Sequence, residues 1–160
     1  MVKIKLNVNG RKYEPQVEPW HTLLHVLRED LGLTGAKKGC DSGQCSACTI
    51  LLDGTPILSC TTLAVSCQGR EITTIEGLAQ GERLHPVQQA FIDHYAVQCG
   101  FCTPGMILHA KALLDGNPSP TEEEVREAIS SNLCRCTGYV KPVEAILAAA
   151  DTLRKGGQDE

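Results

Sequence analysis

The chain has 160 residues, of which nine are cysteine and only six are aromatic, and its formal net charge is −4. This length allows one ordinary domain or two small ones. No apolar run approaches the ~18 residues of a membrane span, no secretion signal opens the chain, and no Lys/Arg run indicates a nucleic-acid partner. We expect a cytoplasmic protein, in which nine thiols need an explanation other than disulfides.

The first half has the pattern of short strands and turns. Apolar and polar side chains alternate over residues 3–8, and the Asn-Gly pair at 9–10 is a strong signal for a hairpin turn. A second hairpin is predicted over residues 49–60, with the Asp-Gly pair at 53–54 as its two-residue turn. Between the hairpins, leucines at helical spacing predict a helix over residues 20–31.

The second half changes to helical periodicity. Residues 86–95 and 103–114 each suit a helix, and a proline stands at the first position of the second one, where its missing N–H costs nothing. A Thr-x-x-Glu capping box at 121–124 opens a third helix, and residues 141–153 form a fourth.

These patterns predict an α+β protein with two domains. A β-rich domain is expected over residues 1–76 and a four-helix domain over residues 77–160, with a frayed tail at 156–160.

Three cysteines in the first half lie in a loop of small residues. Cys40, Cys45 and Cys48 have the C-x4-C-x2-C spacing of plant-type [2Fe–2S] proteins. Backbone N–H groups must turn toward the sulfurs of such an anionic cluster, and bulky side chains would block that approach. The glycine-rich loop therefore favours an iron–sulfur cluster at this position.

The fourth ligand of that cluster can be argued from the second hairpin. If the turn at 53–54 has two residues, Cys60 lies across from Ala47 and beside Cys48. Cys67 lies seven residues further on, beyond the hairpin. Cys60 is the better candidate, and Cys67 is then expected to be a small buried apolar residue.

The other four cysteines form two close pairs. Cys99 and Cys102 stand just before the helix predicted from 103, whose free N–H groups and positive dipole end favour an anionic centre. Cys134 and Cys136 lie in a short link between two helices. The pairs would meet at one end of a helix bundle and form a second four-cysteine site.

Other uses of the thiols are open on spacing alone. Four thiolates from C-x2-C pairs also describe structural zinc sites. Zinc sites usually close within ~12–20 residues, however, whereas about fifty residues separate the two C-x2-C pairs of this chain. Two iron–sulfur clusters are therefore favoured over zinc, with disulfides or thiol redox chemistry as a third alternative.

The histidines carry weaker signals. His21 and His25 stand four residues apart and could in principle hold a metal ion, but with no acidic or thiol partner in that segment we interpret them as surface residues. His85, His94 and His109 are interpreted in the same way. The sequence has no phosphate-binding loop and no nucleophile–base pair, so no catalytic residue is expected in this chain.

Three cysteine motifs, at residues 39–49, 98–106 and 132–139, together resemble the iron–sulfur subunit of the xanthine oxidase (molybdenum hydroxylase) family. The resemblance covers nearly the whole chain in the same order. It implies a plant-type ferredoxin-like β-grasp domain followed by a four-helix domain, each with one [2Fe–2S] cluster. The one departure is Ser46, where a glycine is common, and we expect it to be tolerated if its φ is negative.

The resemblance also implies roles and partners. The cluster on the flavin side would be held by Cys40, Cys45, Cys48 and Cys60, and the cluster on the molybdenum side by Cys99, Cys102, Cys134 and Cys136. Gln98 would contact the pterin, with Cys136 the ligand nearest to it. The expected partners are a large molybdopterin-binding subunit and a medium FAD-binding subunit, in a dimer of heterotrimers.

The function implied is electron transfer. Single electrons would pass between the molybdenum centre and FAD through the two clusters of this subunit, while substrate turns over on the large subunit. A free-standing ferredoxin-like carrier and a zinc-stabilised interaction module are the alternatives.

Overall fold

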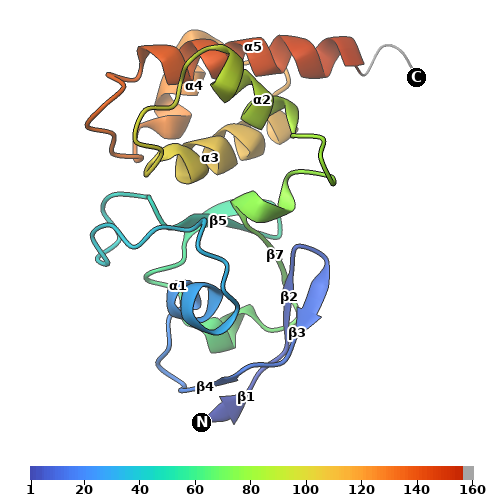
Figure 1. The fold of residues 1–160 in the computed structure, drawn as a ribbon, viewed down its shortest axis with the longest axis vertical. Helices are drawn as coiled ribbons and strands as arrows, with labels where there is room; N and C mark the ends of the chain where they lie inside the picture. Colours follow the sequence, from blue (N-terminus) through green and yellow to red (C-terminus); the bar gives the residue numbers. More distant parts are fainter. Residues whose placement is uncertain (157–160) are drawn as a thin grey trace.

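A computed structural model of the chain describes residues 1–156. It has two parts stacked along the long axis (Figure 1): a sheet-bearing N-terminal part and a helical C-terminal part. The N-terminus lies at the far end of the sheet-bearing part, away from the helices. The sequence-based expectation of an α+β chain with strands first and helices second is confirmed.

The N-terminal part is built on a mixed five-stranded sheet. The strand order is β3-β2-β7-β5-β6, with β2 and β7 parallel and the other neighbours antiparallel. The strands are β2 (Leu6–Val8), β3 (Arg11–Tyr13), β5 (Thr49–Leu52), β6 (Thr55–Leu58) and β7 (Glu71–Thr73). The two hairpins predicted from the sequence therefore belong to one sheet, and β7 lies between them.

The first predicted strand, over residues 3–8, is interrupted. Its start, β1 (Val2–Lys3), pairs with β4 (Gln16–Val17) in a separate two-stranded sheet, whereas β2 pairs with β3. Between them the Ile4 N–H donates to the Pro15 carbonyl at 3.1 Å. The turn at 9–10 is confirmed: both residues have positive φ, as a tight hairpin turn requires.

The helix predicted over residues 20–31 begins later and changes type. Thr22 caps it by accepting a hydrogen bond from the His25 N–H at 3.2 Å, and only α1 (Leu23–His25) is α-helical. A π-helix, η1 (Val26–Asp30), follows, and Gly32 ends the segment with φ +69°. Four apolar residues of this segment are buried in the N-terminal core with the sheet: Leu23, Leu24, Val26 and Leu27.

Four α-helices lie in the second half of residues 1–156, as predicted. They are α2 (Pro86–Asp93), α3 (Thr103–Gly116), α4 (Glu122–Ile129) and α5 (Val140–Gly156). The predicted capping box is confirmed, because Thr121 and Glu124 exchange backbone and side-chain hydrogen bonds. The predicted fraying of the tail concerns residues that, beyond Gly156, lie outside the described part of the chain.

The two parts pack closely against each other. Leu51 of β5 belongs to the buried core of the helices rather than to that of its own sheet. A Cβ placed on Gly105 of α3 would lie 2.6 Å from the carbonyl oxygen of Ser46 and 2.6 Å from the side-chain nitrogen of Asn132. This contact admits only glycine, and it brings the start of α3 against the cysteine loop of the N-terminal part.

Within residues 1–156, no helix combines the length and apolar character needed to cross a membrane.

Candidate iron–sulfur sites

The first cysteine loop turns its backbone amides toward sulfur. The N–H groups of Ser42, Gln44 and Cys45 all donate to the Cys40 Sγ, at 3.2–3.4 Å. The Cys40 N–H donates in turn to the Cys45 Sγ at 3.4 Å. The loop therefore forms a nest of donors that suits thiolate sulfurs or the inorganic sulfides of a cluster.

These donors make Cys40 acidic. Hydrogen bonds from Ser42, then from the N–H groups of Gln44 and Cys45, lower the pKa of the exposed Cys40 thiol to about 6. A thiolate is the form that binds iron. The loop thus favours the thiolate form of Cys40, in which this residue can act as an iron ligand.

Close approach within the loop depends on missing side chains. A Cβ on Gly39 would lie 2.7 Å from the Cys45 Sγ. Ser46, however, does not meet the condition expected of it: it is buried and its φ is +54°, in the left-handed region. The Asn132 side chain donates to the Ser46 carbonyl at 3.0 Å, and the hydroxyl of Thr49 donates to it at 2.8 Å, so packing holds this conformation.

The second hairpin brings Cys60 beside the first group. The register pairs Leu52 with Thr55, as predicted, and the Ser59 N–H donates to the Cys48 carbonyl at 3.4 Å. Burial, and then the neighbouring Cys48 and Cys40 sulfurs, raise the pKa of Cys60 to about 11. The thiolate forms of Cys40, Cys48 and Cys60 would repel one another, and a cationic metal centre would stabilise them.

Cys67 has different neighbours. It is fully buried in η2 (Ala64–Cys67), and its thiol donates to the Leu63 carbonyl at 3.6 Å. Burial raises its pKa, and the other groups that influence it are Ser66, Arg70 and Asp53 rather than another cysteine. The structure therefore sets Cys67 apart from the group around Cys60.

The second group forms where two helix-linking loops meet. The Cys99 and Cys136 sulfurs lie 3.6 Å apart, although the residues belong to different loops. Cys102 is the N-cap residue of α3. Burial and the adjacent Cys134 sulfur raise the pKa of Cys102 to about 12. All four cysteines of this group are thus near one another at one end of the helices, as the spacing predicted.

Cys134 is held by its own loop. Burial acts to raise its pKa, but hydrogen bonds from the side chain and the N–H of Thr137, at 3.1 and 3.4 Å, leave the pKa of the Cys134 thiol below its usual value. The Tyr139 hydroxyl braces the same loop, since it accepts from the Cys134 N–H at 2.8 Å and donates to the Asn132 carbonyl at 3.0 Å. Both groups thus combine four thiols with backbone donors, which suits a [2Fe–2S] cluster in each.

A backbone hydrogen bond joins the two groups directly. The Leu133 N–H, next to Cys134, donates to the carbonyl of Cys45 at 3.1 Å. The Phe101 ring, between Cys99 and Cys102, comes close to Gly39 beside Cys40. Sequence reasoning missed Leu133 and Asn132 as linking residues, because their partners lie far away in the chain and the motifs say nothing about such contacts.

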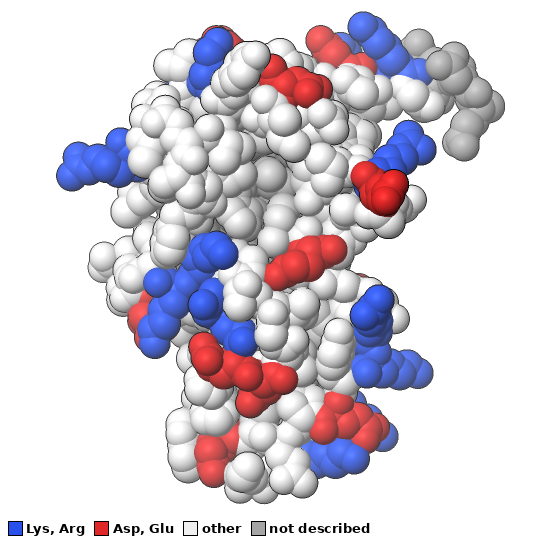
Figure 2. Space-filling view, viewed as in Figure 1, with Lys and Arg blue, Asp and Glu red and all other residues white. Residues whose placement is uncertain are grey.

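One end of the second group opens to solvent. Cys99 and Cys136 are exposed, and the exposed Gln98 side chain donates to the Cys136 carbonyl at 3.1 Å. Exposed apolar side chains occur in the same two loops and at their ends: Tyr95, Val97, Phe101, Leu133 and Val140. In Figure 2, the left side of the helical part is mostly uncharged apart from a projecting Lys or Arg side chain, while charged side chains lie at its top and right and over the sheet-bearing part.

Family models match both halves of the chain. The 2Fe-2S iron-sulfur cluster binding domain matches residues 6–79, and the [2Fe-2S] binding domain matches residues 74–147. The fold and the sites thus define a protein with two [2Fe–2S] clusters.

Similar sequences and a similar solved structure narrow this class of protein. The chain is 54% identical over 92% of its length to the nicotine 6-hydroxylase small subunit of Paenarthrobacter nicotinovorans, covering 89% of it. It is 49% identical over 94% of its length to the nicotinate dehydrogenase small FeS subunit of Eubacterium barkeri, covering 96% of that protein. Quinoline 2-oxidoreductase from Pseudomonas putida 86 matches with a TM-score of 0.92 and 50% identity, over 97% of each chain.

The chain belongs to the iron–sulfur small subunits of the molybdenum hydroxylase (xanthine oxidase) family. Its role is electron transfer within a multi-subunit oxidoreductase. A solved structure of an aldehyde oxidoreductase from Desulfovibrio gigas matches 98% of this chain, with a TM-score of 0.92 and 45% identity. This chain covers only 18% of that protein. The small subunit therefore corresponds there to one part of a longer chain.

Proposed function

We propose that this chain carries single electrons between a molybdopterin-binding large subunit and an FAD-binding medium subunit, in a dimer of heterotrimers. Relatives named as small subunits support a separate chain with larger partners. In this proposal residues 1–76 form the domain facing the flavin and residues 77–160 the domain facing molybdenum. We also propose a cytoplasmic location, because cysteines that serve as iron ligands suit a reducing compartment.

The observation that carries the proposal is the grouping of the thiols. Eight of the nine cysteines fall into two groups, each with its own backbone donors, and Cys67 stands apart. We assign the flavin-side cluster to Cys40, Cys45, Cys48 and Cys60, and the molybdenum-side cluster to Cys99, Cys102, Cys134 and Cys136. No catalytic residue is assigned in this chain.

The exposed end of the second group, with its exposed apolar neighbours, supports placing a partner subunit against it. An electron entering from a partner needs a ligand at the surface, and Cys136 is exposed beside Gln98. We assign Gln98 to contact the pterin and Cys136 as the pterin-proximal ligand. The apolar side chains of the same loops would bury surface against the large subunit, as the core of a protein interface does.

The route between the two sites would use this chain's own backbone. The Leu133 N–H and the Cys45 carbonyl connect the two ligand loops through one hydrogen bond of 3.1 Å. This contact supports transfer between clusters without a detour through solvent. We propose that the large subunit determines the substrate. The names of the relatives refer to nicotine, nicotinate and aldehydes, although each relative is similar in sequence to this chain.

The proposal is tested by what purifies with the tagged chain from its own host. We expect molybdenum and FAD to be retained in the native complex. Val140→Lys should release molybdenum, because Val140 is 52% exposed in the apolar surface beside the second group. Val2→Lys is the matched control, since Val2 is 41% exposed at the opposite end of the molecule.

Two results would contradict the proposal. A chain that purifies alone, with intact clusters but neither molybdenum nor flavin, would indicate a free-standing carrier. Equal molybdenum retention by the Val140→Lys variant and the control would show that the apolar loops are not the interface.

A further inference from the structure

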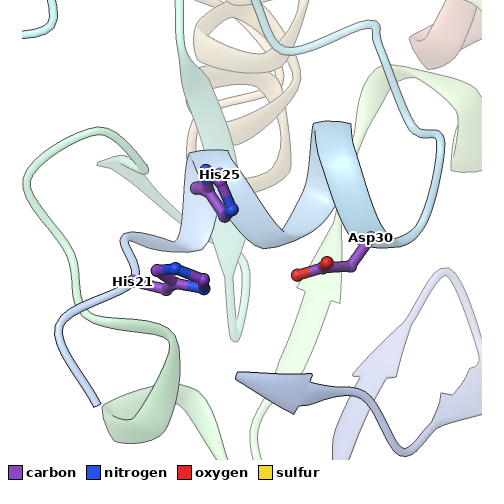
Figure 3. Close-up of side chains that lie close together, drawn as sticks. All are labelled: His21, His25 and Asp30. Carbon is purple, nitrogen blue, oxygen red and sulfur yellow. The ribbon is translucent and has the colours of Figure 1, made fainter. Parts of the chain in front are cut away.

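Three possible metal ligands that belong to neither cysteine group converge beside the first helix. One ligand atom from each of His21, His25 and Asp30 lies within 4.8 Å of the other two. The two imidazole rings are 4.1 Å apart between centroids. In Figure 3, His21 precedes the helix, His25 projects from it, and the Asp30 carboxylate points back toward the histidines.

The π-helix explains why sequence spacing did not bring Asp30 into this group. In a regular α-helix, a residue five positions after His25 lies about 140° around the axis. Here η1 closes with an i→i+5 hydrogen bond, from the Leu31 N–H to the Val26 carbonyl at 3.0 Å. The wider turn aligns Asp30 with His25, and π-turns are frequent at functional sites. The expectation that these histidines lack an acidic partner is therefore wrong.

One candidate ligand atom of this group has no other partner. The Nδ1 atom of His21 is buried and has no hydrogen-bond partner in the described part of the chain. Buried polar atoms are normally paired, so this orphan needs an explanation. The Asp30 side chain is exposed, and its carboxylate points toward the histidines. A metal ion bound through the Nδ1 atom of His21 would give that atom a partner.

The surroundings admit an ion from solvent. His21 and His25 line an open pocket of about 320 Å³, which Cys60 also lines. The charged groups of the pocket balance, since Arg28 and Lys38 are matched by Glu29 and Asp41. Asp30 does not line the pocket, but its carboxylate lies within 4.8 Å of the histidine ligand atoms and adds a negative charge there.

We propose that His21, His25 and Asp30 bind a divalent first-row transition-metal ion such as Zn²⁺. Imidazole nitrogens select such ions over Mg²⁺ and Ca²⁺, and two histidines with one carboxylate leave at least one coordination position for water. Zinc at about 2.0–2.1 Å from each ligand would draw the ligand atoms to about 3.3 Å from one another. His25 and Asp30 are exposed and can make that adjustment by rotating their side chains.

Zinc titration of the cluster-loaded full chain by isothermal calorimetry tests the proposal. We expect one Zn²⁺ to bind per chain with no change in the visible absorption of the clusters. His21→Gln, His25→Gln and Asp30→Asn should each weaken zinc binding by about tenfold or more, because each removes a ligand. His94→Gln, in the helical domain, is the matched control and should bind zinc like the wild type.

A second probe does not depend on calorimetry. Cu²⁺ added to the oxidised chain should show hyperfine splitting from two nitrogens in its paramagnetic resonance spectrum, reduced to one in His21→Gln. Zinc affinity unchanged in either histidine variant would overturn the proposal. Affinity lost in the histidine variants but kept in Asp30→Asn would overturn the three-ligand site.

Discussion

Cys60 and Cys67 show how neighbours rather than residue type decide a role. Both are buried thiols with raised pKa values, but Cys60 adjoins Cys48 and Cys40, whereas Cys67 adjoins Ser66 and Arg70. Composition cannot separate them. The hairpin register can, because Leu52 pairs with Thr55 and so carries the chain back to the cysteine loop.

This difference predicts opposite outcomes for two substitutions. Cys60→Ser should abolish the N-terminal cluster, because a serine hydroxyl is a poor replacement for a thiolate ligand. Cys67→Ala should keep both clusters and lower the free energy of unfolding by about 1 kcal/mol. Paramagnetic resonance of the reduced variants measures which clusters are retained, and denaturant unfolding measures the change in stability. A stable N-terminal cluster in Cys60→Ser, together with its loss in Cys67→Ala, would reverse the assignment.

Ser46 marks a limit of prediction at this scale. A residue other than glycine at φ +54° is uncommon, and the local sequence does not specify it. Besides the nearby Thr49, Asn132 from the helical part donates to the Ser46 carbonyl and helps to hold this conformation. A constraint supplied by a distant residue cannot be read from the loop alone.

Elements with their own local signals were predictable. Both two-residue hairpin turns and the Thr121–Glu124 capping box are encoded by residues at most three positions apart, and all are confirmed. The π-turn of η1 was not predicted, because its apolar residues fit an α-helix equally well. Val26 and Leu27 of η1 are buried in the N-terminal core, and this tertiary packing is not visible in the local pattern.

The start of α3 depends on a glycine that contacts the other domain. Gly105→Ala should lower the free energy of unfolding by about 1–3 kcal/mol, because its Cβ would overlap the Ser46 carbonyl. Gly116→Ala, at the end of the same helix, meets nothing within 4 Å and should be neutral or slightly stabilising. Denaturant unfolding of both variants measures the difference. Equal stability would show that the close contact can relax without cost.

The start of α2 predicts a dependence on pH. Burial, and then the charge of Lys111, lower the pKa of His85 below 6.5, and its Nδ1 must stay unprotonated to accept the Val87 N–H at 3.2 Å. Below pH 6.5 the unfolded chain takes up a proton that folded His85 resists, so this contribution to stability is present above 6.5 and is lost as the pH falls toward the folded pKa.

His85→Asn keeps a capping acceptor and removes this titration. Its melting temperature should therefore fall less than that of the wild type between pH 7 and pH 5. His94→Asn, at the other end of α2, serves as the control and should follow the wild type. An equal fall in His85→Asn and wild type would rule out His85 as the source.

The whole molecule places two ligand loops from different domains against each other. The sequence predicts each loop separately, and the family resemblance predicts their order. The bond from the Leu133 N–H to the Cys45 carbonyl, and the packing of Leu51 into the helical core, appear only in the folded chain. The short connection between the two sites is thus a property of how the domains pack.

The central claim is that eight cysteines hold two separate [2Fe–2S] clusters in series. The direct measurement is iron, acid-labile sulfide and zinc content of the purified chain, combined with paramagnetic resonance after reduction. We predict about four iron and four sulfide per chain and two distinct [2Fe–2S] signals. Stoichiometric zinc without sulfide, or a single signal with half the iron in a fully folded chain, would contradict the account.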